Sequence, residues 1–152
     1  NYFKVEDSAI KNAIENYSPT NNRSQIIQKA TNKIILDAYN ANPTSMGAAL
    51  LNFEKQIGYK IAILGDMFEL GNEAKKEHQQ IVNLAISLNI NQIIFIGANF
   101  YKSETKSTKI NQFKSFDDFK NIYDLSLIKN STLLIKGSRG MALERILTMF
   151  TE

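Results

Sequence analysis

Short apolar runs alternate along this chain with longer stretches in which apolar residues recur at helical spacing. The short runs are rich in β-branched residues and cover residues 33–36, 60–64, 92–96 and 132–135. The helical stretches lie near residues 44–56, 73–88, 116–124 and 139–149. Strands that alternate with helices favour a parallel sheet with right-handed crossovers. The pattern therefore predicts an α/β fold, Rossmann-like, with a mostly parallel sheet flanked by helices.

Two segments depart from this alternation. Residues 3–16 predict a short helix, and a cluster of Ser, Thr, Asn and Pro at residues 17–24 then indicates a linker or domain boundary. Residues 103–115 are polar and rich in Lys and Thr, and we interpret them as a surface loop with one short candidate strand at 109–113. Because the chain begins with Asn1 and not with Met, we expect it to be a piece of a longer protein.

Each of the four predicted strands ends in glycine or polar residues. The ends are Asp37, Gly65-Asp66, Gly97-Ala98-Asn99 and Lys136-Gly137-Ser138-Arg139. In open α/β sheets, ligands bind outside the carboxyl ends of the strands, so these residues are expected to line one rim. Any one of the glycines is explained by the turn that follows a strand. Their coincidence across four strands favours a site.

The densest polar cluster follows the first of these strands. Asp37, Asn40, Asn42, Thr44 and Ser45 lie within nine residues, together with Tyr39. An alternative is a simple helix cap, with Asn42 at the cap position and Pro43 in the first turn. That alternative does not account for Asp37, Tyr39 and Asn40.

Two further motifs carry candidate chemistry. Residues 136–140, Lys-Gly-Ser-Arg-Gly, open the last predicted helix, so Lys136, Ser138, Arg139 and the helix amides suit a carboxylate or phosphate. Residues 65–71 place Asp66 and Glu69 around an apolar turn, and either a substrate role or simple packing explains them. The chain contains neither the Gly-x-x-x-x-Gly-Lys-Ser/Thr phosphate loop nor a Gly-x-Gly-x-x-Gly dinucleotide motif.

Composition narrows the function classes. The 152 residues are 43% hydrophobic and 22% charged, as in an ordinary globular domain, and no cysteine is available for disulfides or thiolate metal sites. The net charge of +3 comes mainly from scattered lysines, which do not form the basic stripe of a nucleic-acid interface. The single histidine, His78, has no second ligand at metal-binding spacing, so we expect a surface or packing residue and no metal site. We find neither a membrane span nor a signal peptide in the sequence.

Four motifs together resemble the Mur ligases of peptidoglycan synthesis. They are Asn-Asn-Arg-Ser-Gln at 21–25, Asp-Ala-Tyr-Asn-Ala-Asn-Pro-Thr-Ser-Met at 37–46, Ile-Leu-Gly-Asp-Met-Phe-Glu-Leu-Gly at 63–71 with His78, and Leu-Ile-Lys-Gly-Ser-Arg-Gly at 134–140. Sibling ligases carry a histidine just before the proline, where this chain has Asn42 after Ala41. The Asn-Ala-Asn-Pro motif is typical of the member that adds D-alanyl-D-alanine to UDP-N-acetylmuramoyl-tripeptide.

The resemblance implies a cytoplasmic, three-domain enzyme with roles in cell-wall synthesis, cell shape and cell division. Residues 1–24 would be the tail of its central ATPase domain with a linker, and residues 25–152 its C-terminal domain. The partners would be the two peptide substrates and the enzyme's own N-terminal and central domains, with no nucleic acid and no membrane span. ATP and Mg²⁺ would act in the full-length enzyme, whose central domain holds the phosphate loop. The fragment alone would bind neither and would be inactive.

The resemblance also implies residue roles. Arg23 matches the arginine that reaches the nucleotide phosphates, and Asp37 matches the acid that faces the nucleotide, so these two are the catalytic candidates. Tyr39 and Asn40 complete the nucleotide side. By position we assign the dipeptide or the reacting centre to Asn40, Asn42, Thr44 and Ser45, carboxylates to Lys136, Ser138 and Arg139, and the dipeptide ammonium to Asp66 and Glu69. The alternative function is a non-catalytic α/β ligand-binding or regulatory module.

Overall fold

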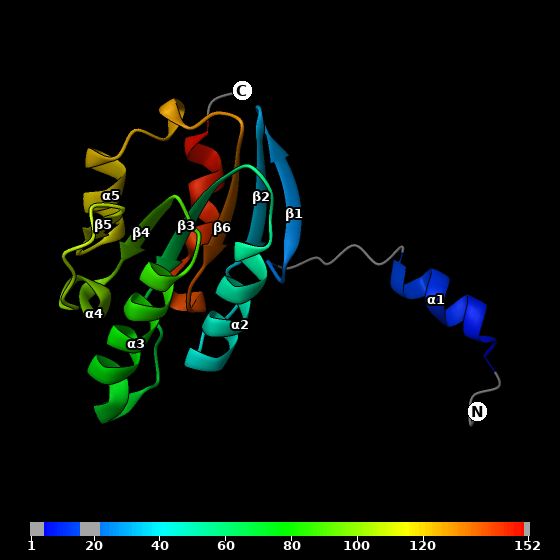
Figure 1. Ribbon diagram of the computed structural model, residues 1–152, viewed down its shortest axis with the longest axis horizontal. Coiled ribbons are helices and arrows are strands. Elements are labelled where there is room, and N and C mark those ends of the chain that lie inside the picture. Colours follow the sequence, from blue (N-terminus) through cyan, green and yellow to red (C-terminus); the bar gives the residue numbers. More distant parts are fainter. Residues whose placement is uncertain (1–4, 16–21, 151–152) are drawn as a thin grey trace.

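The computed structural model describes residues 5–15 and 22–150, and its centre is a six-stranded sheet (Figure 1). The strand order is β1-β2-β6-β3-β4-β5. All neighbouring pairs are parallel except β1 and β2, which are antiparallel. The strands are β1 Gln25–Lys29, β2 Asn32–Asp37, β3 Tyr59–Gly65, β4 Gln92–Ile96, β5 Ile110–Phe113 and β6 Ser131–Lys136. The predicted α/β fold with a mostly parallel sheet is confirmed.

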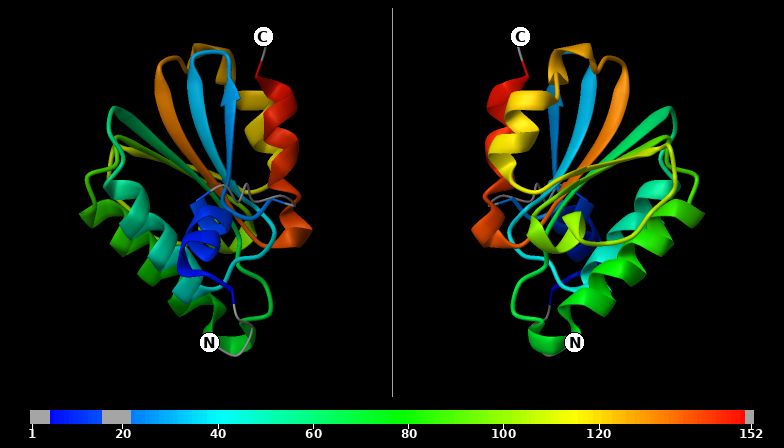
Figure 2. Two further views of the ribbon diagram at one scale, coloured as in Figure 1. Left: turned by 90° about the vertical axis from the view of Figure 1, so that its right-hand side faces the viewer. Right: turned by 90° about the vertical axis from the view of Figure 1, so that its left-hand side faces the viewer.

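Helical segments cover both faces of the sheet (Figure 2). One face packs against α2 Pro43–Glu54, α3 Ala74–Ser87 and α4 Ala98–Tyr101, with η1 Gly71–Glu73 leading into α3. The other face packs against α5 Phe116–Ile122, η2 Leu125–Leu127 and η4 Leu143–Met149, and the short η3 Arg139–Met141 precedes η4. Because both faces are covered, the inner strands β3, β4 and β6 are almost continuously buried.

The N-terminal helix α1, Asp7–Glu15, stands apart from the sheet in Figure 1. Its apolar side chains Ile10 and Ile14 are exposed, at 42% and 70%. The helix agrees with the prediction for residues 3–16 as far as the structure describes them; residues 1–4 and 16–21 lie outside the described part. An amphipathic helix with a bare apolar face is typical of a segment that packs against something else.

Two sequence predictions need correction and one is confirmed. The candidate strand predicted at residues 109–113 is present as the edge strand β5 at residues 110–113. Residues 25–29, for which the pattern predicted no element, form β1. Residues 139–149 form two 3₁₀ segments and not one helix, because Ala142 adopts a left-handed conformation (φ 48°) between them. A three-residue 3₁₀ turn does not provide the amides of a helix N-terminus, so the anion site expected there does not have that basis.

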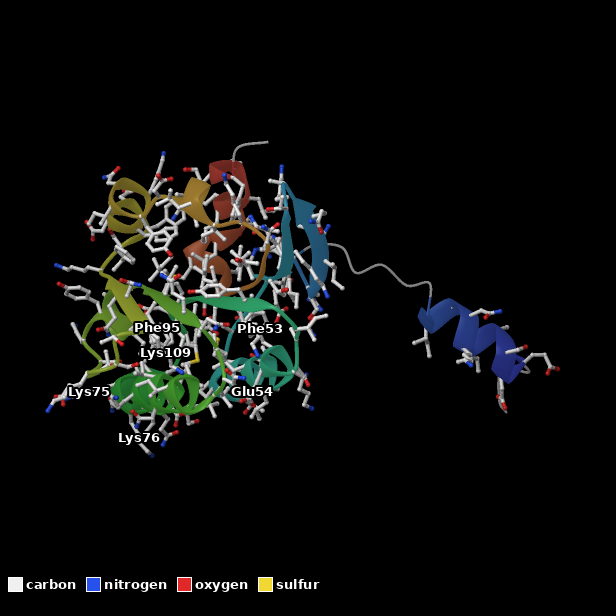
Figure 3. The ribbon with its side chains drawn as sticks, turned by 45° about the horizontal axis from the view of Figure 1, so that its top comes forward. Phe53, Glu54, Lys75, Lys76, Phe95 and Lys109 are labelled. Carbon is white, nitrogen blue, oxygen red and sulfur yellow. The ribbon has the colours of Figure 1, made fainter. Side chains whose placement is uncertain are left out.

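Three lysines labelled in Figure 3 lie in two different settings. Lys109 is part of the scaffold, since its Nζ donates to the carbonyl oxygens of Ile86 at 2.7 Å and Leu88 at 2.9 Å, at the end of α3. Lys75 and Lys76 are exposed on the outer surface of α3.

No helix within the described ranges is long and apolar enough to cross a bilayer.

Candidate functional site

The carboxyl ends of β2, β6, β3 and β4 form the predicted rim. Asp37 at the end of β2 pairs in register with Lys136 at the end of β6, and Leu64 of β3 pairs with Lys136 from the other side. β4 lies next to β3 and ends at Ile96, opposite Gly65. Parallel pairing therefore brings the four polar strand ends together, as the sequence predicted.

Asp37 and Lys136 form an ion pair at the centre of this rim. Lys136 Nζ donates to Asp37 Oδ2 at 2.6 Å and to the Asn40 carbonyl oxygen at 3.1 Å, and its side chain is only 2% exposed. The other carboxylate oxygen, Asp37 Oδ1, accepts from the Ser24 amide at 3.2 Å. The Lys136 ammonium is thus buried and bonded to partners within the protein, while the Asp37 side chain remains 22% exposed to solvent.

Arg23, Tyr39 and Arg139 form a cluster on the exposed side of the rim. The Arg23 guanidinium carbon lies 4.0 Å from the centroid of the Tyr39 ring, and that of Arg139 lies 5.4 Å away. The pKa of the Tyr39 phenol is lowered, mainly by a hydrogen bond from Arg23 and by its charge, with Arg139 adding to the effect. The structure therefore brings together residues that the sequence assigned to the nucleotide and to the peptide.

Ser138 joins the loops that follow β2, β3 and β6. Its Oγ accepts from the Phe68 amide at 2.9 Å and donates to the Ala41 carbonyl oxygen at 3.3 Å. Its own amide donates to the Asp66 carbonyl oxygen at 3.1 Å. Ser138 is only 4% exposed, so its present contacts hold the shape of the rim.

Asp66 is 3% exposed and caps the short helix α4. Its carboxylate accepts from the amides of Asn99 and Phe100, each at 2.9 Å. A Cβ atom at Gly97 would lie 2.3 Å from Asp66 Cγ, so this approach needs glycine. Of the two alternatives for Asp66, fixing the loop matches the contacts observed.

His78 is fully buried and fixes the next part of the same loop. Its Nδ1 lies 2.6 Å from the Ala74 carbonyl oxygen, and its Nε2 accepts from the Met67 amide at 3.0 Å. This pattern requires the neutral tautomer with the proton on Nδ1. Of the surface and packing roles that the sequence left open for His78, the structure shows the buried one, with hydrogen bonds that the sequence did not reveal.

The start of α2 carries the predicted helix cap. Asn42 and Ser45 form a capping box, in which Ser45 N donates to Asn42 Oδ1 at 2.8 Å and Asn42 N donates to Ser45 Oγ at 3.1 Å. Asn40 Oδ1 accepts from the Ala41 amide at 2.9 Å. Thr44 is exposed in the first turn of the helix.

A cavity of about 410 Å³ opens between these loops. Among the described residues that line it, Glu69 supplies a carboxylate and Arg139 a guanidinium, while Phe68 and Leu70 supply apolar surface. Phe68, Leu70 and Gly140 were not predicted as site residues. The sequence signal for Gly140 was its place at the end of the Lys-Gly-Ser-Arg-Gly motif. In the structure, a Cβ atom at this position would lie 2.8 Å from the Phe68 ring. The remaining lining residues are Tyr39, Asn40, Ala41, Asn42 and Ser138.

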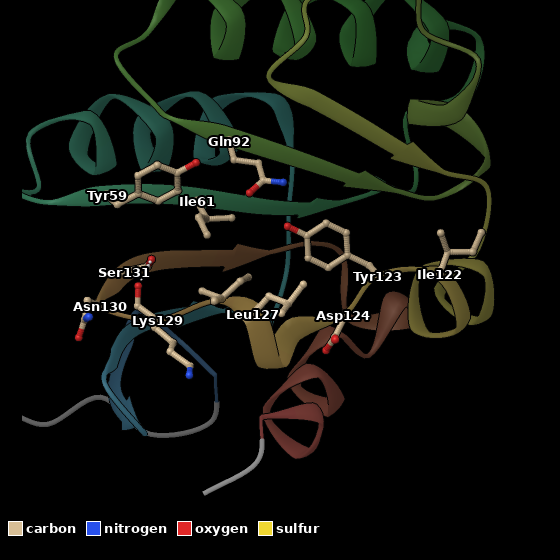
Figure 4. A pocket seen from close by; sticks show the side chains of 11 residues that line it. Tyr59, Ile61, Gln92, Ile122, Tyr123, Asp124, Leu127, Lys129, Asn130 and Ser131 are labelled. Atoms are coloured by element: carbon tan, nitrogen blue, oxygen red, sulfur yellow. Dashed lines mark hydrogen bonds between the residues drawn. The ribbon is translucent and has the colours of Figure 1, made fainter.

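A larger cavity, of about 700 Å³, lies at the amino ends of the strands, opposite the polar rim (Figure 4). Tyr59 and Ser131 begin β3 and β6 there, and Tyr123 and Leu127 reach in from the layer that covers this face. Burial raises the pKa of the Tyr123 phenol. Its position at the amino ends of the strands separates this cavity from the polar rim.

The rim contains donors for an anion but no evident metal site. The exposed guanidiniums of Arg23 and Arg139 suit phosphate or carboxylate oxygens. In the part of the chain that the structure describes, no three His, Asp or Glu side chains are grouped to hold a metal ion.

Comparison with known proteins gives consistent matches. The profile of the family "Mur ligase, glutamate ligase domain" matches residues 22–139. UDP-N-acetylmuramoyl-tripeptide--D-alanyl-D-alanine ligase from Buchnera aphidicola is 34% identical over 95% of this chain, and the Escherichia coli enzyme of that name is 31% identical over 95%. The chain covers 32% of the length of each, so it spans about a third of these relatives.

Two solved structures share the fold. A crystal structure of MurF from Acinetobacter baumannii matches with a TM-score of 0.82 at 29% identity, covering 96% of this chain and 34% of that one. MurF ligase from Thermotoga maritima in complex with ADP matches with a TM-score of 0.75 at 26% identity, covering 89% and 31%.

Proposed function

This chain belongs to the Mur ligase family, and from that membership we propose that it is the C-terminal domain of a ligase that uses ATP to join D-alanyl-D-alanine to UDP-N-acetylmuramoyl-tripeptide. The family, the relatives and the shared fold do not favour the alternative of a non-catalytic binding module. The proposed reaction belongs to peptidoglycan synthesis, and through it to cell shape and division. Its nucleotide substrates make the cytoplasm the expected location.

The cavity at the rim is the observation that carries the proposal. A dipeptide such as D-alanyl-D-alanine carries an ammonium at one end, a carboxylate at the other and two methyl groups between. The cavity offers Glu69 for the ammonium, Arg139 for the carboxylate and the Phe68 and Leu70 side chains for the methyl groups. Asn40, Asn42, Thr44 and Ser45 lie on or near its wall and are assigned to the dipeptide or the reacting centre.

The buried residues of the rim act on this substrate through the loops that they hold. Ser138, Asp66 and Lys136 are at most 4% exposed and already satisfied by internal partners, so their contribution is to position Phe68, Glu69 and Asn40. A preorganised rim avoids the entropic cost of ordering loops around a small substrate. Direct contact with the peptide carboxylates is left to Arg139.

The nucleotide side is assigned to Arg23, Asp37, Tyr39 and Asn40. Arg23 would contact the phosphates, and the exposed edge of Asp37 would face the nucleotide when this domain closes against the ATPase domain. The phosphate loop and the Mg²⁺ ligands are expected in that upstream domain. Closure would protect a phosphorylated peptide carboxylate from water until the dipeptide amine attacks it. The ADP complex of the Thermotoga maritima relative supports nucleotide use.

We assign residues 1–24 to the end of the ATPase domain and its linker, and residues 25–152 to the C-terminal domain. The exposed apolar face of α1 supports this division, because Ile10 and Ile14 need a partner surface. The turn at Asn22–Ser24 is attached to the C-terminal domain through Ser24 and Asp37. Its backbone has positive φ at Asn22 (59°) and Ser24 (49°), and Arg23 between them lies over the Tyr39 ring.

The test uses the full-length enzyme, with product and ADP measured against D-alanyl-D-alanine concentration. Arg139→Gln and Glu69→Gln are expected to raise the KM for the dipeptide about tenfold or more, since each removes a charge-assisted contact. Asp37→Ala and Arg23→Ala are expected nearly to abolish turnover while the domain stays folded. Lys75→Gln on the outer surface of α3 is the matched control. A wild-type enzyme that forms no amide from these substrates, or charge variants with an unchanged KM, would refute the assignment.

A further inference from the structure

The two exposed arginines of the rim, Arg23 and Arg139, both lie over the ring of Tyr39. Arg23 lies 4.0 Å and Arg139 5.4 Å from its ring centroid. Two guanidiniums repel each other, and a ring face with a phenol oxygen attracts both. The lowered pKa of the phenol has the same cause, first the hydrogen bond from Arg23 and then the charges of both arginines.

The Tyr39 backbone is fixed to the end of the sheet. Its amide donates to the Asn22 carbonyl oxygen at 3.1 Å, and its neighbour Ala38 is 2% exposed. One residue further back, Asp37 is held by Lys136 at 2.6 Å. Any side chain that rests on Tyr39 is therefore positioned relative to β2 and β6.

The two arginines come from separate parts of the chain, one from the turn before β1 and the other from the start of η3, after β6. Neither has another aromatic partner among the described residues. Arg23 is assigned to the phosphoryl group and Arg139 to a carboxylate, so a ring that touches both fixes the spacing between the two charges.

We propose that Tyr39 is a positioning residue, which keeps Arg23 and Arg139 at a fixed spacing, with Arg23 on the phosphoryl group of the acyl phosphate and Arg139 on the carboxylate of the incoming dipeptide. This inference rests on the proposed function. In that reaction the dipeptide amine forms the new C–N bond, the bond from the acyl carbon to the phosphate oxygen breaks, and its electron pair leaves with inorganic phosphate. The protons of the ammonium pass to solvent. Arg23 would bind the departing phosphate, and Arg139 would keep the dipeptide carboxylate in place beside the reacting carbon.

Loss of Tyr39 is expected to affect the coupling of ATP use to amide formation more than the binding of the substrates. If Tyr39 is lost, each arginine still carries its charge, but the two no longer keep a fixed spacing. The acyl phosphate is then held less well while the amine approaches, and water attacks it more often. ADP would accumulate beyond the amount of peptide product. A residue that only stabilised the fold would lower both products together and leave their ratio unchanged.

The experiment measures ADP and ligated product in the same reaction of the full-length enzyme, for wild type, Tyr39→Phe and Tyr39→Leu. Tyr39→Leu is expected to raise the ratio of ADP to product roughly fivefold or more, because it removes both cation–π contacts. Tyr39→Phe keeps the ring and loses the phenol oxygen, so its ratio is expected between the two. Tyr101→Leu, at a tyrosine that is 51% exposed on α4, is the matched control and should keep the wild-type ratio.

The outcomes separate the two proposals. A wild-type enzyme that makes no product fails the proposed function, and this inference falls with it. A wild-type enzyme that ligates normally, with a Tyr39→Leu variant that is slower but equally coupled, overturns this inference alone. Thermal melting of each variant identifies any loss of folded protein, and the ratio is compared per folded molecule.

Discussion

Asp37 and Lys136 are paired twice, once by the backbone register of two parallel strands and once by an ion pair of 2.6 Å between their side chains. The register is a consequence of two apolar strands that end at the same level. The ion pair then places a carboxylate at the rim with one oxygen neutralised and 22% of the side chain open. Asp37 is therefore both a structural anchor and the candidate residue that faces the nucleotide.

Lys136→Met is expected to lower the free energy of unfolding by about 1–3 kcal/mol, because Asp37 and the Asn40 carbonyl oxygen lose a buried donor. The cost stays below that of a fully buried pair because water reaches part of Asp37. Urea denaturation followed by circular dichroism measures it. Lys33→Met, at a partly buried lysine of the same sheet bonded to Gln56, is the control and should cost less than half as much. Equal losses would contradict the role given to Lys136.

Ser138→Ala is expected to cost about 1–3 kcal/mol and to raise the KM for the dipeptide, because the Phe68 amide is left without its acceptor. The loop that carries Phe68 and Glu69 would then lose its fixed position beside the cavity. Urea denaturation and steady-state kinetics of the full-length enzyme measure the two effects. Ser126→Ala, at an exposed serine bonded to Asp124, should leave the KM unchanged. A stable Ser138→Ala variant with normal kinetics would contradict the tie between the three loops.

The rim was predictable from sequence because parallel strands place their carboxyl ends together, whatever the details of the loops. Asp37, Asp66 and Lys136 were found in that way. The sequence did not predict which polar residues of the rim hold the loops and which remain exposed. That depends on contacts between loops far apart in the chain, such as Ser138 with Ala41 and with Phe68. A sequence pattern identifies polar residues at a strand end, but it does not show which of them are buried.

Two errors in the fold have local causes. The hairpin of β1 and β2 turns at Ala30, which has a φ of 47°, and the Asn-Gly or Asp-Gly signal that marks such turns is absent. Residues 139–149 have the apolar spacing of a helix, but Ala142 at φ 48° interrupts it. In both places an alanine adopts a conformation that its type rarely takes, so propensity alone pointed elsewhere.

Gly97→Ala is expected to destabilise the protein far more than Gly58→Ala, although both glycines have positive φ. A Cβ atom at Gly97 would lie 2.3 Å from Asp66 Cγ, while one at Gly58 would meet nothing within 4 Å. Gly58→Ala then carries only the backbone cost of about 1 kcal/mol. Gly97→Ala adds the displacement of a buried carboxylate that caps α4, for a total of roughly 3 kcal/mol or more. Urea denaturation of both variants decides it, and similar losses would contradict the close approach.

Alkaline titration tests the Arg23–Tyr39–Arg139 cluster directly. The chain has six tyrosines, and the pKa of Tyr39 is lowered while that of Tyr123 is raised by burial, so Tyr39 is expected to ionise before Tyr123. The ultraviolet absorbance of tyrosinate measures this, and the early step should disappear in Tyr39→Phe and move to higher pH in Arg23→Gln.

The same shift makes stability depend on pH. Because the pKa of Tyr39 in the folded protein lies below the unfolded value of about 10, the stabilisation that its ionised form contributes is fully present above that value. It is lost as the pH falls through the folded pKa. The stability difference between wild type and Tyr39→Phe should therefore widen from neutral pH towards about 10. An early step that survives in Tyr39→Phe, or a difference that narrows with rising pH, would remove the physical basis for the paired arginines.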